Sequence, residues 1–338
     1  MPGSTTFDFG AYLFGISPGV GVNKEDLLDQ ITNVSPWDTP WCSQAPKVPC
    51  QHVYHQWLTD TLFSSLSDPA IDLTGAVEGA DWNNDTDTSP VRVFNVTMIL
   101  RRDIGVSETQ RAIASAGFKD VYAYEIQKAV KRLSIKLERI AFGQLTTATG
   151  ATGVGRVMRG FQSFIATNTA RAGGSTAAAN DGVLTSQDFN DMLNTIYSAG
   201  GNPEQVYTSA KVKRQVSAFT LPQQNRNIAS VDKRLVSGID FYDSDFGLIQ
   251  IVLDRWVPES TNAAGVTATA SATSTGGKMF FLQRSINRLA WLRPMQHNLI
   301  GRRGDSVAGV VVGEVTLEVL NEQANGMIVN VNNRSSVT

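Results

Sequence analysis

The chain has 338 residues, of which 29 are basic and 31 acidic, so its net charge of −2 gives no global positive field that would draw it to nucleic acid. Its apolar fraction of 42% is enough for one large or two medium-sized domains, and no apolar run reaches the roughly 18 residues of a membrane span. The first twenty residues lack the basic and apolar regions of a signal peptide, and two cysteines do not make a disulfide framework, so we expect a cytoplasmic protein.

Residues 1–47 have the pattern of an N-terminal arm, with scattered aromatic residues between glycines and prolines. Within the arm, KEDLLDQITNV (24–34) predicts a short helix with acidic residues in its first turn. The next segment, SPWDTPWCSQAP (35–46), holds three prolines and two tryptophans, and the prolines argue against a helix. Because this segment is too apolar for a free tail, we expect its tryptophans to pack against this chain or an adjacent copy.

Two β-rich segments follow, VPCQHVYHQWLTDTLFSSL (48–66) and VRVFNVTMILRRDIGVS (91–107). The stretch between them has few large apolar side chains besides Trp82, so the pattern predicts a long hairpin-like loop with a polar tip. A hairpin that finds no cover in its own domain is only marginally stable. We therefore expect this loop to pack on a neighbouring subunit.

The clearest predicted helix is FKDVYAYEIQKAVKRLSIKLERIAF (118–142). Its expected apolar stripe, at spacings of 4, 3, 4 and 3, consists of Ile126, Val130, Leu133, Leu137 and Ile140. Its other faces carry Lys128, Lys131, Arg132, Lys136 and Arg139. Gly143 follows as a stop signal.

Beyond this helix the elements alternate without a regular βαβ rhythm, which predicts an α+β fold. We expect two helices, at 186–201 and 210–219, the first with Ser186 as N-cap and Gly200–Gly201 as stop. Strands are expected at 204–210, twice in 240–258, once in 278–294 and twice in 307–331, the last two joined by an Asn325–Gly326 turn. Residues 144–184 and 260–277 are rich in small and polar residues and are expected to form mobile surface loops.

The common motifs of enzyme chemistry are missing from the sequence. It has neither a phosphate-binding loop nor a G-x-S-x-G nucleophile elbow. Cys42, Cys50, His52 and His55 are the residue types that bind zinc, but their spacing matches none of the usual fingers or ribbons. We favour packing roles for these residues and expect no metal and no cofactor.

Three carboxylates, Glu314, Glu318 and Glu322, share one face of a predicted strand. A pair of carboxylates can do acid–base work, which keeps open a soluble hydrolase that uses Glu314 and Glu318. The interpretation that we favour is the solvated face of a half-buried strand. Arg303–Gly304–Asp305 is interpreted as a loop tip.

Several segments, in the same order along the chain, resemble major capsid proteins of tailed bacteriophages. They are NVSPWDTPWCSQAPK (33–47), HQWLTDTL (55–62), VEGADW (77–82), SETQRA (107–112), GGNPEQVYTSAKVKRQVSAF (200–219), YDSDFGLIQIV (242–252), LAWLRP (289–294) and GEVTLEVLNEQANGMIVNV (313–331). The resemblance fails in the inserts rich in alanine and threonine. It implies the Hong Kong 97-type capsid fold.

The resemblance also implies a division of the chain. It assigns residues 1–47 to the arm, 48–106 to an extended loop over a neighbouring subunit, 107–184 to a peripheral domain with the long helix, 185–293 to an axial domain, and 294–338 to strands that complete both domains. The side chains that we expect at contacts between subunits are Trp37, Trp41, Trp57, Asp60, Glu78, Trp82, Arg101 and Arg102.

The implied function is assembly and not catalysis. Pentamers and hexamers would form an icosahedral or prolate head shell around packaged double-stranded DNA, which is contacted non-specifically. Portal protein is an implied partner. We expect a cement protein, because no lysine lies between Lys47 and Lys119 for a covalent cross-link from the loop, and a separate scaffold protein, because the sequence shows no long N-terminal scaffolding domain. A nanocompartment shell of the same fold that encloses protein cargo is the alternative.

Overall fold

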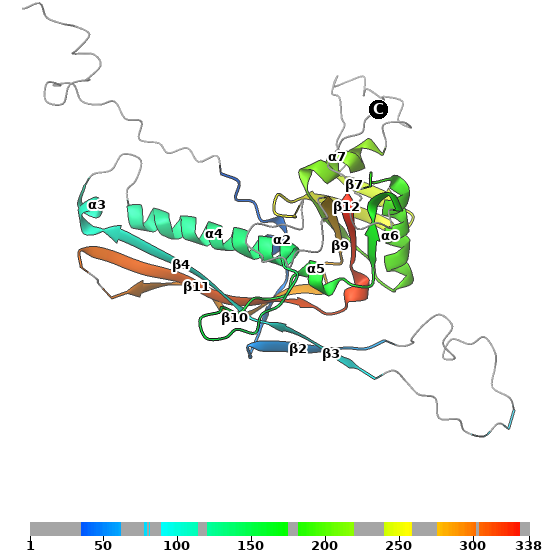
Figure 1. Ribbon diagram of the computed structural model, residues 1–338, viewed down its shortest axis with the longest axis horizontal. Coiled ribbons are helices and arrows are strands. Elements are labelled where there is room, and N and C mark those ends of the chain that lie inside the picture. Colours follow the sequence, from blue (N-terminus) through cyan, green and yellow to red (C-terminus); the bar gives the residue numbers. More distant parts are fainter. Residues whose placement is uncertain are drawn as a thin grey trace, which may run out of the picture.

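The structure is a computed structural model, and it describes residues 35–61, 78–79, 81, 89–113, 120–174, 182–219, 240–258, 276–301 and 304–331. Its elements form two large sheets and a separate hairpin (Figure 1). The predicted helix at 24–34, Trp82 and nearly all of the predicted loop at 260–277 lie outside the described residues. None of the described helices is both long and apolar enough to cross a membrane.

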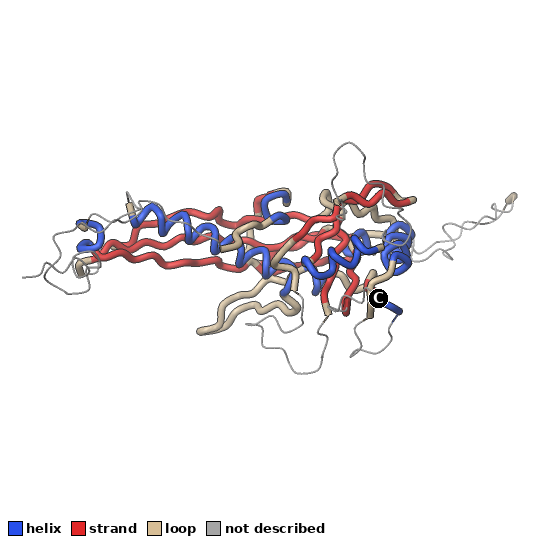
Figure 2. Tube along the Cα trace, turned by 90° about the horizontal axis from the view of Figure 1, so that it is seen from above, coloured by secondary structure: helices blue, strands red, loops and turns tan. Residues whose placement is uncertain are grey.

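The longer sheet has four strands in the order β1-β10-β11-β4. Their bounds are Lys47–Pro49 for β1, Asn287–Ile300 for β10, Ser306–Val319 for β11 and Met98–Ser107 for β4. Strands β10 and β11 are antiparallel neighbours, and β11 continues the antiparallel pairing to β4. Seen from above, helix α4 (Val121–Gly143) runs along these long strands (Figure 2).

Helix α4 confirms the helix predicted at 118–142. It begins after Asp120, whose side chain accepts hydrogen bonds from the N–H groups of Tyr122 and Ala123. Leu133 and Leu137 are buried against the sheet as predicted. Val130, however, is 40% exposed, and the alanines at 129 and 141 are buried in its place. The buried stripe is therefore rotated from the predicted one, because small side chains let the helix approach the sheet closely.

The second sheet has six strands in the order β5-β12-β9-β6-β8-β7. Their bounds are Thr169–Arg171 (β5), Gly326–Val331 (β12), Gly277–Leu282 (β9), Gln205–Thr208 (β6), Gly247–Leu253 (β8) and Phe241–Ser244 (β7). Helices α6 (Ser186–Ser198) and α7 (Ala210–Ala218) share a hydrophobic core with one face of this sheet. The other face joins the core beneath α4 through Tyr207 and Phe280.

The start of α6 corrects the predicted cap. Thr185, and not Ser186, is the N-cap, since its side chain accepts from the Asp188 N–H while the Asp188 carboxylate accepts from the Thr185 N–H at 3.0 Å. The helix ends as predicted, with Gly200 in the left-handed region at φ 86°.

The proline-rich segment at 35–46 contains a helix, so that prediction was wrong. Helix α2 spans Pro40–Gln44, with its proline in the first turn, where the missing N–H is not needed. The N–H groups of Trp41 and Cys42 both donate at 2.8 Å to the carboxylate of Glu138 on α4. The helix therefore exists because a partner from elsewhere in the chain satisfies its free N–H groups.

The prediction of a mobile loop over residues 144–184 was wrong for much of that range. Met158, Phe161 and Ile165 are buried in the main core, and Phe161–Phe164 forms the short helix α5. The ring of Phe142, at the end of α4, lies 5.5 Å from the Phe161 ring and 5.2 Å from the Phe280 ring, centroid to centroid. This aromatic group joins the two sheets.

The predicted turn at Asn325–Gly326 does not form a hairpin. Strands β11 and β12 belong to different sheets, and residues 320–325 lead from one to the other through a 3-10 turn at Glu322–Ala324. The buried Asn325 side chain exchanges hydrogen bonds with Asn287, at 2.8 and 3.1 Å. The two expected strands are correct, but their connection is a crossing between sheets.

Candidate functional site

The feature that stands apart from both sheets is the hairpin of β2 (Tyr54–Thr59) and β3 (Val91–Val96). The two strands pair antiparallel from Tyr54 opposite Val96 to Thr59 opposite Val91, as the loop prediction required. The hairpin lies on the side of the long sheet away from α4 (Figure 1). Its two faces therefore have different surroundings.

The inner face of the hairpin is fixed to the long sheet. Trp57 is buried there, and the buried Asn95 donates to the Leu317 carbonyl on β11 at 2.7 Å. The Asn95 side-chain oxygen accepts from the Arg159 N–H at 2.8 Å. An asparagine whose donor and acceptor are both satisfied without water fixes the position of the strand that carries it.

The outer face of the same hairpin carries exposed apolar side chains, together with the exposed Gln56 and Arg92. Leu58 is 65% exposed, and Tyr54 and Phe94 are each 40% exposed. Because side chains alternate along a strand, these residues point away from Trp57 and Asn95. The hairpin thus presents a hydrophobic surface that this chain does not cover among its described residues.

The carboxylates of β11 were predicted to be solvated, and that prediction was wrong. Glu314 is only 3% exposed and Glu318 only 6%. Glu314 accepts from the Thr97 hydroxyl at 2.7 Å and pairs with Arg156 and Arg293. The strand is covered on both sides, by α4 on one and by the hairpin and the 147–157 loop on the other, so no face is left to water there.

Each carboxylate on β11 contacts a different part of the chain. Glu318 lies 2.9 Å from the imidazole Nε2 of His55 on the hairpin. Glu322, just beyond β11, accepts from the backbone N–H groups of Ala166 and Thr167 and from the Thr167 hydroxyl. These contacts occupy the acids that a hydrolase would need, and they hold distant segments against β11.

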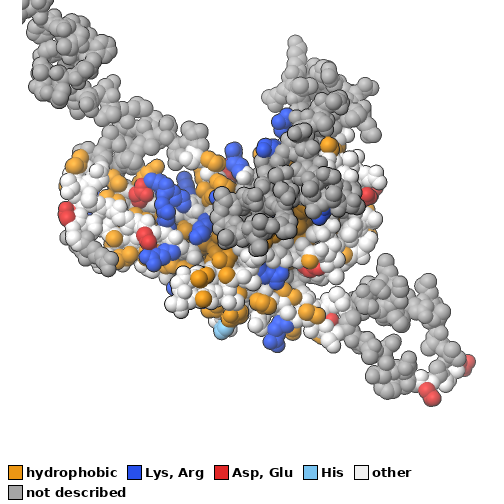
Figure 3. All heavy atoms as spheres, viewed as in Figure 1, with side chains coloured by type: hydrophobic (Ala, Val, Ile, Leu, Met, Phe, Trp, Pro, Cys, Tyr) orange, Lys and Arg blue, Asp and Glu red, His pale blue; other side chains and the backbone are white. Residues whose placement is uncertain are grey.

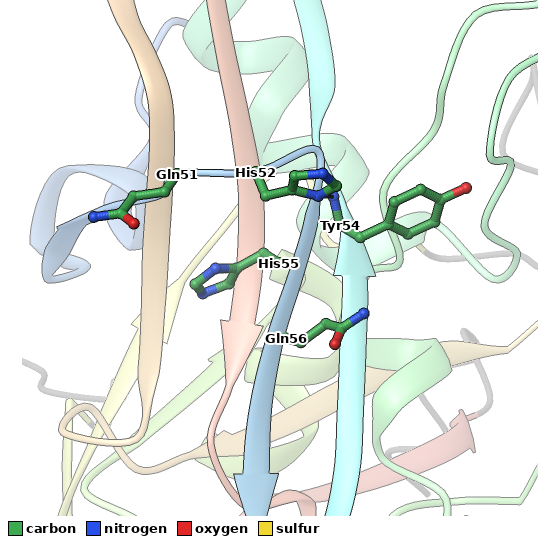
Figure 4. Close-up of a pocket in the computed structure, with 5 residues that line it drawn as sticks. All are labelled: Gln51, His52, Tyr54, His55 and Gln56. Carbon is green, nitrogen blue, oxygen red and sulfur yellow. Dashed lines mark hydrogen bonds between the residues drawn. The ribbon is translucent and has the colours of Figure 1, made fainter.

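A hollow of about 480 Å³ beside the hairpin base is lined by Gln51, His52, Tyr54, His55 and Gln56 (Figure 4). His52 Nδ1 accepts from the Tyr54 N–H at 3.1 Å, whereas His55 turns to Glu318. The Cys50 thiol donates to the His52 carbonyl, and Cys42 is buried beside Glu138. Within the described ranges, no three His, Cys, Asp or Glu side chains gather as a metal site would require.

The comparisons with known proteins decide the family. The profile of the SU10 major capsid protein family matches residues 4–332. The chain belongs to this family. A curated major capsid protein of Escherichia phage Phieco32 is 33% identical over 126 residues, which are 37% of this chain and 34% of that protein. The chain thus aligns with about a third of the length of this curated relative.

Solved structures show the fold. The capsid asymmetric unit of cyanophage A-1(L) matches with a TM-score of 0.65 and 13% identity, over 91% of this chain and 97% of that one. A Mycobacterium phage Ogopogo structure matches with a TM-score of 0.60 and 13% identity, over 91% and 96%. The holo-SrpI encapsulin of Synechococcus elongatus PCC 7942 matches with a TM-score of 0.55 and 10% identity, over 94% and 95%. The Hong Kong 97-type capsid fold and the α+β class are therefore confirmed.

The residues predicted at subunit contacts of this capsid protein lie in different settings. Trp37 is 57% exposed, with the Lys131 ammonium 4.7 Å from its ring centroid. Trp41 and Trp57 are buried within this chain and present almost no surface to a neighbour. The exposed residues of the set are Asp60 at the end of β2, Glu78, and Arg101 and Arg102 on β4.

Sequence reasoning missed the residues that hold the hairpin, namely Asn95, His55 and Glu318. The only signal was an asparagine and a histidine within strongly β-forming runs, where polar residues usually mark a solvent face.

We predict that Glu314→Gln lowers the free energy of unfolding by about 2–3 kcal/mol, because Arg156 and Arg293 lose the charge that they contact in a largely buried site. The measurement is equilibrium unfolding of the purified full-length chain in urea. Glu125→Gln, which removes the partner of Lys128 on the surface of α4, is the matched control and should cost less than about 0.5 kcal/mol. Equal effects of the two changes would contradict a structural role for Glu314.

Proposed function

We propose that this protein is the shell-forming subunit of a tailed-phage head, assembled as pentamers and hexamers around double-stranded DNA. The observation that carries the proposal is the hairpin with two different faces: Asn95 and His55 fix the inner face, and the described residues leave the apolar side chains of the outer face exposed. Such a surface suits contact with another copy of the same chain. Assembly in the host cytoplasm and residence in the virion belong to this proposal.

The division of the chain is part of the same proposal. We assign the long sheet with α4 to the peripheral domain and the six-stranded sheet with α6 and α7 to the axial domain. The extended loop is proposed over residues 48–106, and its last strand, β4, pairs with β11 in the long sheet. The hairpin β2–β3 is then the part of the loop that is available to a neighbour, with Trp37, Asp60, Glu78, Arg101 and Arg102 as further proposed contacts.

Non-covalent burial is the proposed basis of shell stability. Each large apolar side chain that a neighbour covers contributes about 1.5–3 kcal/mol, and closure of a shell repeats the contact in every subunit. The sequence has no lysine between Lys47 and Lys119, so the hairpin cannot supply one for a cross-link. We propose a separate scaffold protein, a cement protein and a portal protein as the remaining partners.

We predict that Leu58→Asp abolishes shell formation but leaves the isolated chain folded, because this side chain is exposed in the subunit and would be desolvated between subunits. The measurements are sedimentation velocity for assembly and circular dichroism for folding. The control is Leu58→Met, which keeps the apolar surface and should assemble normally. Full-size shells from Leu58→Asp would remove the hairpin from the interface.

The outer surface of α4 is the proposed contact with packaged DNA. Lys131, Arg132, Lys136 and Arg139 are exposed on this helix, and Figure 3 shows lysine and arginine side chains gathered over it. The neighbouring acid Glu138 is buried and does not neutralise this surface, and Glu125 pairs with Lys128. Four cations on one side of a chain with a net charge of −2 form a local site for phosphates.

A triple variant tests the DNA contact. Lys131, Arg132 and Lys136 changed to Gln should weaken binding of the full-length protein to duplex DNA and reduce the slope of log affinity against log salt by about 3. The control changes Arg92, Arg101 and Arg288 to Gln, which alters net charge equally on the hairpin side of the sheet. Fluorescence anisotropy over a salt series measures both variants, and equal losses would contradict a contact specific to α4.

A cargo-enclosing nanocompartment is the second candidate, favoured by the similarity to an encapsulin over 94% of this chain. The contents of purified particles distinguish the two functions, since a phage head encloses nuclease-protected DNA and a nanocompartment encloses protein.

A further inference from the structure

Three separate parts of the chain meet at one pair of buried acids. Glu138 on α4 and Asp254, just after β8, are both fully buried, and they lie close enough for the charge of Glu138 to raise the pKa of Asp254. Glu138 uses its two oxygens to accept from the N–H groups of Trp41 and Cys42 on α2. The pair therefore links the arm segment, the long helix and the six-stranded sheet.

The hydrogen bonds assign a proton to Asp254. Both Glu138 oxygens accept from N–H donors, as an ionised carboxylate does. One Asp254 oxygen accepts from the Trp256 N–H at 2.8 Å, and its second oxygen, Oδ2, is buried and meets no donor among the described residues. Two ionised carboxylates repel each other in a buried site, so a proton on Asp254 directed toward Glu138 accounts for the buried oxygen that meets no donor.

Among the described residues, no cation is a cause of the raised pKa of either acid. The Cys42 thiol and the Tyr207 hydroxyl face the pair, and burial raises the pKa of each, so both are neutral. The nearest cations act on these neighbours, Lys47 on Cys42 and Arg284 on Tyr207. Burial raises the pKa of Glu138, but the hydrogen bonds from Cys42 and Trp41 oppose this rise. Burial, and then the charge of Glu138, raises the pKa of Asp254 to about 8, so the proton belongs on Asp254.

We propose that the proton shared by Glu138 and Asp254 closes a joint between α2, α4 and the end of β8, and that its release to solvent opens the joint. This device belongs to the single chain and does not depend on the proposed shell function. When the proton leaves, two negative charges face each other without water, and separation of the three elements relieves the repulsion. The N–H groups of Trp41 and Cys42 then lose their acceptor.

The direction of the pH effect follows from the raised pKa. In the open joint Asp254 is hydrated and has an ordinary acidic pKa, whereas in the closed joint it keeps its proton to about pH 8. Between these values the closed form binds one more proton than the open form. The equilibrium constant for opening therefore rises roughly tenfold for each unit of pH. Above about pH 8 the loss is complete and the equilibrium no longer changes with pH.

Hydrogen exchange of the Trp41 and Cys42 amides in the full-length wild-type protein tests the joint directly. After correction for intrinsic exchange rates, the opening constant of the 39–45 peptide should rise roughly tenfold per unit between about pH 6 and pH 8. This result is independent of any substitution. A flat profile in the wild type would overturn the proposal.

Two matched variants identify the proton. In Asp254→Asn the amide donates permanently to Glu138, so the pH dependence should disappear while protection remains. Asp243→Asn makes the same change at an exposed site on β7 and should keep the wild-type slope. A wild-type slope in Asp254→Asn, or a lost slope in Asp243→Asn, would each show that this pair is not the titrating group.

Discussion

The burial of both faces of β11 positions the long sheet, helix α4 and the hairpin. Residues along a strand alternate between its two sides, and on β11 one side carries Val315 and Leu317 into the core beneath α4. The other side carries Glu314 and Glu318, which are equally buried. A strand that buries carboxylates needs partners for them, so the positions of the hairpin and of the 147–157 loop are set by where those charges lie.

This constraint explains how one hairpin can be firmly held and yet open to a neighbour. Asn95 and His55 use their polar atoms toward β11, which leaves the alternate side chains on the outer face. The charges on β11 therefore fix position and register, and the outer face is the surface that we propose for association. The same logic applies at Glu138, where a buried acid gives the short helix α2 the acceptor that its sequence lacks.

The sequence was sufficient for elements whose signals are local. The apolar repeat and the stop at Gly143 predicted α4 to within a few residues, and β-rich runs on either side of a polar stretch predicted the hairpin. It was not sufficient where the environment comes from distant segments. Periodicity places Glu314 and Glu318 on one face but does not say whether that face meets water or another layer. Similarly, the alanine- and threonine-rich composition of 144–184 concealed the buried Phe161 and Met158, and the prolines of 35–46 concealed a helix whose N–H groups bond to Glu138.

We propose a subunit whose open surface is covered by its own copies, on a fold shared with phage capsid and encapsulin structures. Electron cryomicroscopy of particles formed by the full-length protein tests this account most directly, because the hairpin can be traced against its neighbours. The account predicts closed shells in which Leu58 and Phe94 lie against an adjacent subunit while Trp57 stays buried in its own chain. Shells in which the outer face of the hairpin remains in solvent would contradict it.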